Sequence, residues 1–409
     1  MTKNILESFS PEQQLEFERI LECLGNFDYE KIDLKEDIGI FNGFSGISLL
    51  LYYLYQYKEN DHWADKAEYF FKKSYDNLSS DNFNLSHGTS GVMWLLYYLK
   101  SKEFIDDEFE SVFLGYDKLL LKKVDDYMGD IDPMHGLLSI ANYLFLRNTD
   151  MAIDCLKKIL DRVENEKIIF NETMVYWEVK SNDLISGTIT HINFGYAHGV
   201  LAILYFLSKY IKAGLNLDQA IPLFEQGINY FLSVQDEYNY MQFPNRIQEG
   251  NAKNTTRVAY CYGDLGLACG LTAIANNLSR PDLLAKARSL ANNTASFSIK
   301  EIEKVDDVGL CHGAAGNGYM FLKLFNIHHD EILRDASVEQ FKRLLALRNK
   351  NREEGVMGFS SIDYDYSKKE YYKKTDPGFI TGTSGIGLAI LGLLNDLEET
   401  DWDTILLLQ

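Results

Sequence analysis

Two short cysteine motifs carry the residue types best suited to chemistry in this chain. Cys261-Tyr262-Gly263 and Cys311-His312-Gly313 lie fifty residues apart, and each stands in a glycine-rich turn ahead of an apolar stretch. Zinc binds thiolate sulfur and imidazole nitrogen in tetrahedral geometry, and a catalytic zinc keeps only three protein ligands. We therefore predict that Cys261, Cys311 and His312 bind Zn²⁺ and leave its fourth position open.

Two thiolates and one neutral imidazole would give such a zinc site a net charge near zero. A site of this kind is a weak Lewis acid toward water, but it suits the binding and deprotonation of an incoming thiol. We therefore expect a thiol substrate, whose attack on an electrophile also requires a proton donor in the same cavity. His198 is the candidate donor, because an unperturbed imidazole titrates at about pH 6.5.

Five further side chains have a functional and a structural interpretation. Asp132 could orient or tune a neighbouring histidine, or it could cap a helix. Arg257 could balance thiolate charge, hold an oxyanion or form an exposed salt bridge, and Tyr262 could donate a hydrogen bond into the cavity or simply pack. His87 and His135 each precede a glycine. Either could be a fourth ligand or an acid, or could hydrogen-bond at a helix start.

A G-x-x-G unit followed by ten or more mainly apolar residues recurs seven times. The units begin at Gly43, Gly88, Gly136, Gly199, Gly263, Gly313 and Gly382, with Ser139 and Ala202 in the last place of the third and fourth. The apolar stretches predict buried inner helices, and the amphipathic stretches at 65–78, 152–164, 283–297 and 337–347 predict outer helices. Seven inner and seven outer helices predict an all-α fold, an α/α toroid that forms a single domain over residues 1–409.

Three longer gaps between the repeats predict insertions near residues 168–193, 236–256 and 355–377. They are rich in aromatic residues and lack a helical period. We interpret them as rim loops that could cover or line a cavity at one end of the inner helices.

Composition excludes several functional classes. A net charge of −20 would repel nucleic acid and anionic lipid, which bind through lysine and arginine. No apolar run reaches the roughly 18 residues of a membrane span, and the N-terminal residues lack the apolar core of a signal peptide, so we expect a cytoplasmic protein. Cys23, Cys155 and Cys269 are expected to be small buried hydrophobic residues rather than partners in disulfides.

At these motifs the sequence resembles the lanthionine synthetase C-like family, the zinc cyclases of class I lanthipeptide biosynthesis. The resemblance covers nearly the whole chain and implies that Cys261, Cys311 and His312 are the zinc ligands. It also implies acid/base work for His198 and Asp132, and a lining role near the metal for Arg257 and Tyr262. Besides the glycine units, it rests on Phe194-Gly195-Tyr196-Ala197-His198-Gly199, Arg257-x-x-x-Cys261-Tyr262-Gly263, Leu310-Cys311-His312-Gly313-Ala314-Ala315-Gly316 and Trp402-x-x-x-Leu406-Leu407.

The reaction that the resemblance implies is an intramolecular Michael addition. A cysteine thiolate of a dehydrated precursor peptide attacks dehydroalanine or dehydrobutyrine, and protonation of the α-carbon completes a thioether ring. A separate dehydratase and an exporter are the implied partners, and they could bring the protein to a membrane. Two positions depart from the family pattern, Leu265 in place of a proline and Ala202 in place of a glycine, and both affect local turn geometry rather than a ligand.

Three other functions fit parts of the pattern. A relative in the same family could add glutathione to dehydroamino acids, and a non-catalytic peptide-binding scaffold could use a fourth protein ligand to close a structural zinc site. A protein prenyltransferase also combines helices, zinc and a peptide thiol, but it needs basic residues for a diphosphate. No such basic cluster stands beside the two cysteine motifs.

Overall fold

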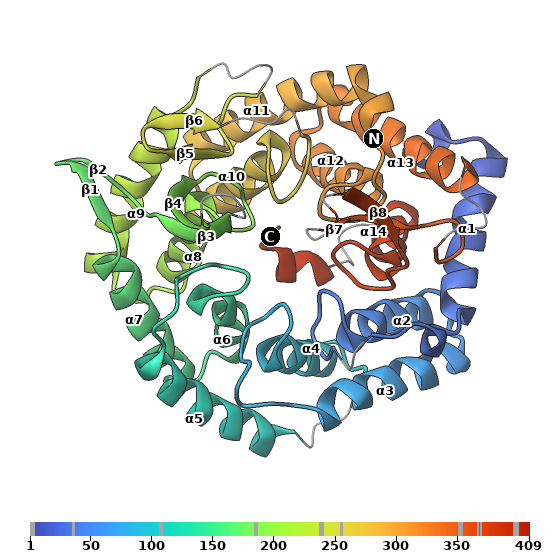
Figure 1. Ribbon diagram of the computed structural model, residues 1–409, viewed down its shortest axis with the longest axis horizontal. Helices are drawn as coiled ribbons and strands as arrows, with labels where there is room; N and C mark the ends of the chain where they lie inside the picture. Colours follow the sequence, from blue (N-terminus) through green and yellow to red (C-terminus); the bar gives the residue numbers. More distant parts are fainter. Residues whose placement is uncertain are drawn as a thin grey trace. The chain divides into compact units, whose positions relative to one another are not determined.

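The computed structural model describes residues 5–34, 37–105, 109–183, 187–236, 241–253, 257–350, 355–365, 368, 370–395 and 401–409. Helices dominate this part of the chain (Figure 1). Seven of them follow the glycine units: α2 (Phe44–Lys58), α4 (Thr89–Ser101), α6 (Ala141–Arg147), α8 (Val200–Lys212), α10 (Asp264–Leu278), α12 (Ala314–His328) and α14 (Thr383–Leu394). A 3₁₀ turn, η3 (Leu137–Ile140), leads into α6.

Seven amphipathic helices alternate with these along the chain. They are α1 (Pro11–Asn26), α3 (Asp61–Asp76), α5 (Glu110–Asp126), α7 (Asp150–Asn165), α9 (Leu217–Ser233), α11 (Pro281–Lys300) and α13 (Glu331–Lys350). Four short 3₁₀ helices complete the set: η1 (Ile5–Ser8), η2 (Tyr29–Lys31), η4 (Ile302–Lys304) and η6 (Trp402–Leu406). The predicted alternation of two helix types is thus present in the described part of the chain.

Burial distinguishes the two helix types. In α2 the ten consecutive residues 45–54 are all buried, as expected for a helix that is apolar on every side. In α7 the buried residues recur every three or four positions, from Ala152 through Leu156 to Val163, and the other side of the helix is polar. Among the described residues, no helix combines the length and apolar character needed to cross a membrane.

The chain divides into two compact units. Unit 1 contains Met1–Ser79, Ser86–Leu95 and Asn292–Asp401, and unit 2 contains Ser80–Leu85, Leu96–Ala291 and Trp402–Gln409. In unit 1, α14 packs against α2 and α12, and each of those packs against the amphipathic helix that follows it. In unit 2, α8 packs against α9 and α10, while α7 packs against α5 and α6. In both units a glycine-started helix is therefore covered by an amphipathic one.

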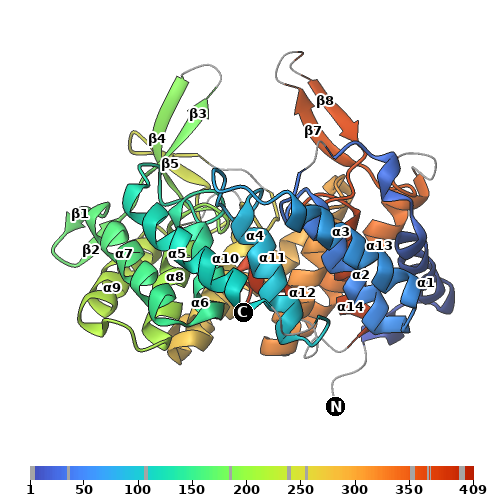
Figure 2. The same ribbon diagram turned by 90° about the horizontal axis from the view of Figure 1, so that it is seen from below.

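The three insertions, which we interpreted as rim loops, contain β-strands. Residues 237–240 and 254–256 of the second insertion lie outside the described part. In unit 2, β1 (Ile168–Asn171) and β2 (Met174–Tyr176) form a hairpin, and a four-stranded antiparallel sheet contains, in chain order, β3 (Val179–Asp183), β4 (Gly187–Asn193), β5 (Arg246–Gln248) and β6 (Asn251–Lys253). In unit 1, β7 (Ser361–Asp365) and β8 (Glu370–Lys374) form a second hairpin. The β3–β4 and β7–β8 hairpins each extend beyond the helices of their own unit (Figure 2).

A hydrogen-bonded turn precedes six of the seven glycine-started helices. Six positions before the helix glycine stands an Asp or Asn whose Oδ1 accepts a hydrogen bond from the backbone N–H two residues later. The pairs are Asp37 with Gly39, Asn82 with Asn84, Asp130 with Asp132, Asn193 with Gly195, Asp307 with Gly309 and Asp376 with Gly378, at 2.8 to 3.4 Å. Only the fifth repeat differs, because Arg257 occupies this position. A turn closed by a side chain in this way can hold a loop in one conformation although the loop belongs to no helix or sheet.

Two of the three expectations for the remaining cysteines are confirmed. Cys155 and Cys269 are buried, but Cys23 is exposed. Cys23 lies on α1 between the buried Leu21 and Leu24, so the helical period turns its side chain toward solvent.

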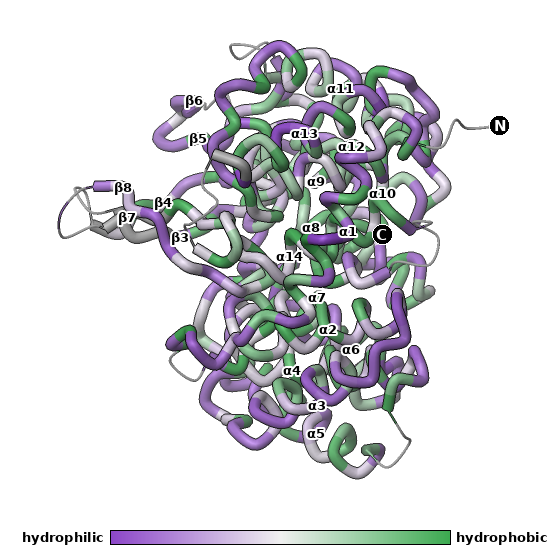
Figure 3. Tube along the Cα trace, turned by 90° about the vertical axis from the view of Figure 1, so that its right-hand side faces the viewer, coloured by the Kyte–Doolittle hydropathy of each residue, from purple (hydrophilic) through white to green (hydrophobic). Residues whose placement is uncertain are grey.

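Figure 3 shows how hydrophobic and hydrophilic residues are distributed along the described chain, with strand β6 drawn mainly in the hydrophilic colour.

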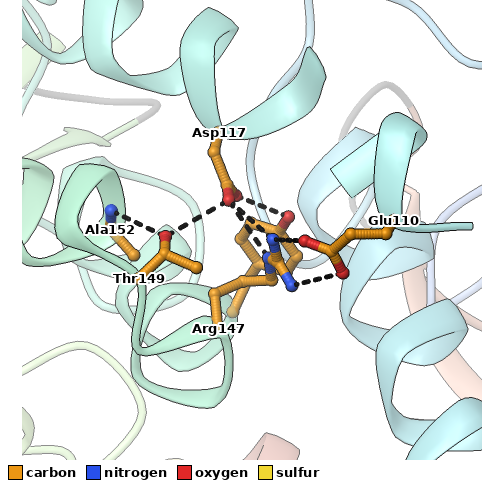
Figure 4. A network of polar contacts seen from close by, with 6 residues as sticks. Glu110, Asp117, Arg147, Thr149 and Ala152 are labelled. Carbon is orange, nitrogen blue, oxygen red and sulfur yellow. Dashed lines mark hydrogen bonds and ion pairs between the residues drawn. The ribbon is translucent and has the colours of Figure 1, made fainter. Parts of the chain in front are cut away.

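A buried ion-pair network joins α5, α6 and α7 in unit 2 (Figure 4). The carboxylate of Asp117, which is 0% exposed, accepts hydrogen bonds from Arg147 Nε at 3.1 Å and from Tyr143 Oη at 2.8 Å. Arg147 also donates to Glu110 at 2.8 Å. Thr149, which caps the start of α7 through Ala152 N–H, completes the network at 3.4 Å from Asp117.

We expect Asp117→Asn to lower the free energy of unfolding by about 3 kcal/mol, because it leaves a buried guanidinium without its charged partner. Urea denaturation followed by circular dichroism measures this change. Asp154→Asn is the matched control, since the ion pair of Asp154 with Lys157 is more than half exposed, and it should cost less than about 1 kcal/mol. Equal effects of the two substitutions would contradict the prediction.

Candidate functional site

The chemistry-bearing residues occupy the one or two positions directly before the helix glycines. His87, His135, His198 and His312 each stand one position before such a glycine, and Cys261 and Cys311 stand two positions before. The turn described above holds the loops of the four histidines and of Cys311 in related conformations, so these residues have equivalent places at the starts of their helices. Cys261 lies in the fifth repeat, which lacks this turn. The two units contribute to this set separately and are described in turn.

In unit 1, Cys311 and His312 precede α12. Cys311 is partly buried, and its backbone N–H donates to the carbonyl of Ile380 at 2.9 Å. The imidazole Nε2 of His312 lies 3.3 Å from Oδ2 of Asp307, whose side chain is 3% exposed. A carboxylate on one ring nitrogen orients the other nitrogen toward a metal in many metal sites. Nδ1 is therefore the nitrogen of His312 that this arrangement leaves for a ligand role.

Asp307 is a residue that the sequence prediction missed. Its Oδ1 holds the turn through Gly309 N–H at 2.9 Å, while Oδ2 faces His312. One carboxylate thus stabilises the loop and lies close to the imidazole. The recurrence of Asp or Asn six positions before the helix glycine was the signal in the sequence that could have identified it.

In unit 2, Cys261 precedes α10 in a loop that depends on two glycines. Gly263 has φ +108°, a conformation that residues with a side chain rarely adopt. Gly195 lies against the same loop, where an added Cβ would stand 2.3 Å from the carbonyl oxygen of Cys261. The loop that carries His198 can therefore approach the loop that carries Cys261 only because residue 195 is glycine.

His198 and Asp132 form the clearest acid/base pair in unit 2. Nδ1 of His198 lies 2.8 Å from Oδ2 of Asp132, and both side chains are largely buried. Oδ1 of the same carboxylate accepts from the backbone N–H groups of Met134 at 2.8 Å and His135 at 2.7 Å. Asp132 therefore contacts a histidine and also closes its own loop, whereas the cap position of η3 is occupied by Gly136.

The pKa values of this pair move apart. Burial alone would lower the pKa of His198, but the hydrogen bond and charge of Asp132, together with Cys261, raise it above the ordinary histidine value. Burial raises the pKa of Asp132, but the hydrogen bond and charge of His198 and the backbone hydrogen bonds from His135 and Met134 together outweigh burial, and the net pKa is lowered. The geometry thus favours an imidazolium against a carboxylate.

The other two histidines have local partners. The ring of His135 stacks on that of His198, with centroids 5.3 Å apart and an interplanar angle of 27°. In unit 1, Nδ1 of His87 lies 3.2 Å from Oδ2 of Asp37. This contact matches the structural interpretation of His87 as a hydrogen-bonding residue at a helix start.

Tyr262 and Arg257 differ in their surroundings. The hydroxyl of Tyr262 accepts a hydrogen bond from Asn193 Nδ2 at 3.1 Å, and burial raises its pKa. Arg257 is exposed and is not among the residues that line the cavity of unit 2. Its proposed contact with an oxyanion stays a prediction.

Unit 2 contains a cavity of about 510 Å³. It is lined by Asp130, Asp132, Val179, Lys180, His191, Asn193, His198, Asn245, Arg246, Lys253 and Tyr262. The His198–Asp132 pair and Tyr262 therefore face the same space. This volume can admit a few residues of a peptide, and its polar lining suits a polar backbone.

Three comparisons relate the chain to known proteins. Residues 35–407 match the family described as lanthionine synthetase C-like protein. The nisin biosynthesis protein NisC of Lactococcus lactis subsp. lactis is 20% identical over 94% of this chain and 90% of its own length. The solved structure of a nisin cyclase superposes with a TM-score of 0.69 and 17% identity, over 98% of both chains. This likeness confirms the predicted all-α, α/α-toroid fold.

Asp264, the first residue of α10, is a buried carboxylate beside the Cys261 loop. It is 1% exposed, and its Oδ2 accepts from Gln242 N–H at 2.6 Å. Burial raises its pKa to about 7, compared with about 3.9 for an unfolded aspartate. Between these two values the folded protein binds more protons than the unfolded one, so this group lowers stability as pH rises from about 4 to about 7.

We expect Asp264→Asn to remove this part of the pH dependence. The free energy of unfolding of the wild type minus that of the variant should decrease by up to about 4 kcal/mol when the pH rises from 4 to 7. Urea denaturation at several pH values measures the difference. Asp61→Asn, at the first position of α3 where the side chain is exposed, should leave the slope unchanged. The same slope in Asp264→Asn and wild type would refute the assignment.

Proposed function

Because the chain belongs to the lanthionine synthetase C-like family, we propose that it is a zinc-dependent lanthipeptide cyclase. It closes thioether rings in a dehydrated precursor peptide. A new bond joins the sulfur of a peptide cysteine to the β-carbon of dehydroalanine or dehydrobutyrine. The thiol loses a proton and the α-carbon gains one, so the mass of the peptide does not change.

The donor set fits zinc. Cys261, Cys311 and His312 each offer one ligand atom, and the three residues could hold a metal ion. Two sulfurs and one nitrogen are ligands that zinc prefers, and three protein ligands leave one position for a substrate atom. When bound, zinc would lower the pKa of the substrate thiol so that sulfur is nucleophilic at neutral pH. Asp307 supports the fit because its carboxylate lies 3.3 Å from Nε2 of His312, where carboxylates commonly support a metal-binding histidine.

The observation that carries the catalytic proposal is the His198–Asp132 pair on the wall of the cavity. Attack of sulfur on the β-carbon moves an electron pair toward the α-carbon and its carbonyl, and the resulting enolate must be protonated. Since Nδ1 of His198 is held by Asp132, Nε2 is the nitrogen that can deliver this proton. Asp132 stabilises the imidazolium before the transfer and fixes the ring in place.

The position of Tyr262 gives it a role in the proposed reaction. Its hydroxyl is held by Asn193 and lines the same cavity, directly next to Cys261 in the chain. A fixed phenol at this place can hydrogen-bond to the enolate oxygen while its charge develops. Arg257 keeps its proposed role near the metal from the family pattern.

The substrate class follows from the relatives. NisC is named for nisin biosynthesis, and the similar solved structure is a nisin cyclase. We extend from these names only the class, a dehydrated precursor peptide. The separate dehydratase, the exporter and the cytoplasmic location remain predictions from the sequence.

We expect the purified chain to bind about one zinc ion and to consume the free thiols of a dehydrated precursor without a change in its mass. Cys261→Ala should lose the zinc and this activity, yet keep the far-ultraviolet circular dichroism of the wild type. Cys23→Ala, an exposed cysteine outside the donor set, is the control and should keep both. A Cys261→Ala protein that no longer folds would instead favour a structural zinc site.

We expect His198→Gln to slow ring closure by about a hundredfold or more, because the variant lacks a group that can deliver the proton. Zinc content should not change. Thiol loss measured over time at fixed peptide concentration tests this, with the exposed His62→Gln on α3 as the control. An unchanged rate in His198→Gln would remove this histidine from the mechanism.

A further inference from the structure

Part of the cavity wall is formed by residues of the β3–β6 sheet. Lys180, Arg246 and Lys253, which we call the cationic wall, all line the cavity. This concentration of positive charge stands out in a chain whose net charge is −20. The proposed proton transfer makes no use of these three residues.

Strand register places two of these cations on the same face. Asn193 on β4 pairs with Arg246 on β5, and Arg246 in turn pairs with Lys253 on β6. Residues directly opposite in neighbouring strands share a face. His191 stands two residues before Asn193 and therefore lies on this face as well. The guanidinium and the ammonium thus lie side by side next to Asn193, which holds Tyr262.

A buried polar atom on the same wall points to a ligand. His191 is 4% exposed and lines the cavity, and its Nδ1 has no hydrogen-bond partner within the described part of the chain. Burial of such an atom costs free energy unless a ligand or water satisfies it. Burial and the charge of Arg246 lower the pKa of His191, so the ring is neutral and can donate from one nitrogen.

The cations also lack ion-pair partners among the described residues. No carboxylate of that part lies within 4.0 Å of the charged atoms of Arg246, Lys253 or Lys180, whereas Arg147, Arg162 and Arg280 of the same unit have acidic partners. The acidic residues of the cavity, Asp130 and Asp132, belong to the loop before η3, and Asp132 is engaged by His198. The half-buried guanidinium of Arg246 and the exposed ammonium groups of Lys180 and Lys253 are therefore available to an anionic ligand.

We propose that the cationic wall binds a carboxylate of the peptide substrate, so that an acidic group near the reacting residues selects and positions the peptide beside His198. This inference rests on the proposed function for the identity of the substrate. A guanidinium presents paired N–H donors that match the two oxygens of a carboxylate, and a neighbouring ammonium adds charge. The carboxylate could come from an aspartate or glutamate side chain or from the C-terminus of the peptide.

Binding of three fluorescein-labelled synthetic peptides to the zinc-loaded full-length protein tests the proposal without turnover. All contain one cysteine and one serine instead of a dehydrated residue. The first has a central glutamate and an amidated C-terminus, the second has glutamine and an amidated C-terminus, and the third has glutamine and a free C-terminal carboxylate. Fluorescence anisotropy gives each Kd. Whichever of the first and third binds more tightly than the second identifies the source of the carboxylate.

We expect a carboxylate peptide to bind about ten- to a hundredfold more tightly than the amidated glutamine peptide. Arg246→Gln should abolish this preference, and Lys253→Gln should reduce it independently in case the first variant folds poorly. Neither should change the Kd of the uncharged peptide. Lys118→Gln, the same charge change on the exposed surface of α5 in the same unit, should keep the full preference.

Equal affinity of wild-type protein for all three peptides, including no measurable binding of any, would overturn the proposal. So would a preference that survives in both Arg246→Gln and Lys253→Gln. Thiol loss from dehydrated precursor tests the proposed function separately. Ring closure without a carboxylate preference would refute the cationic wall alone, and a preference without ring closure would refute the cyclase alone.

Discussion

The way in which the chain enters its buried helices is the constraint on which the chemistry depends. A helix start leaves backbone N–H groups without partners, and burial prevents water from satisfying them. In six repeats an Asp or Asn side chain closes the preceding turn, and its own carbonyl accepts from the first helical N–H in several of them, for example from Ala314 to Asp307 at 2.9 Å. The positions just before the helix glycine are thereby held in a defined direction. Those are the positions of Cys311 and of His87, His135, His198 and His312, whereas Cys261 stands in the fifth repeat, which lacks this turn.

Two carboxylates link this structural role to reactivity. Asp132 and Asp307 each use one oxygen for backbone N–H groups and the other for an imidazole. The loop cannot change conformation without moving the histidine, and the histidine cannot rotate without losing a charged partner. Such pre-organisation lowers the cost of placing a catalytic or ligating nitrogen, because the loop is already ordered when substrate arrives.

The sheet adds cations to the cavity, and the helix loops that line the cavity do not. Its strands come from two insertions separated by α8 and α9, and pairing of β4 with β5 brings Asn193 beside Arg246. One side of the cavity therefore carries acid/base groups from helix loops, and the strands add cations. A largely acidic surface with a local cationic wall would bind an acidic group inside the cavity rather than elsewhere on the protein.

The sequence by itself determined the helices and identified the candidate metal ligands. Apolar periodicity is a local property, so the sequence predicts the seven glycine-started helices and the amphipathic helices between them. Cysteine and histidine are residue types that commonly bind metals, so they indicate candidate ligands directly. Tertiary structure decided the pairings. His198 and Asp132 are 66 residues apart in the chain, Arg246 lies 53 residues after Asn193, and the exposure of Cys23 depends on which side of α1 is covered. Strand pairing and side-chain contacts at such separations depend on how distant segments pack, and no short stretch of sequence encodes that packing.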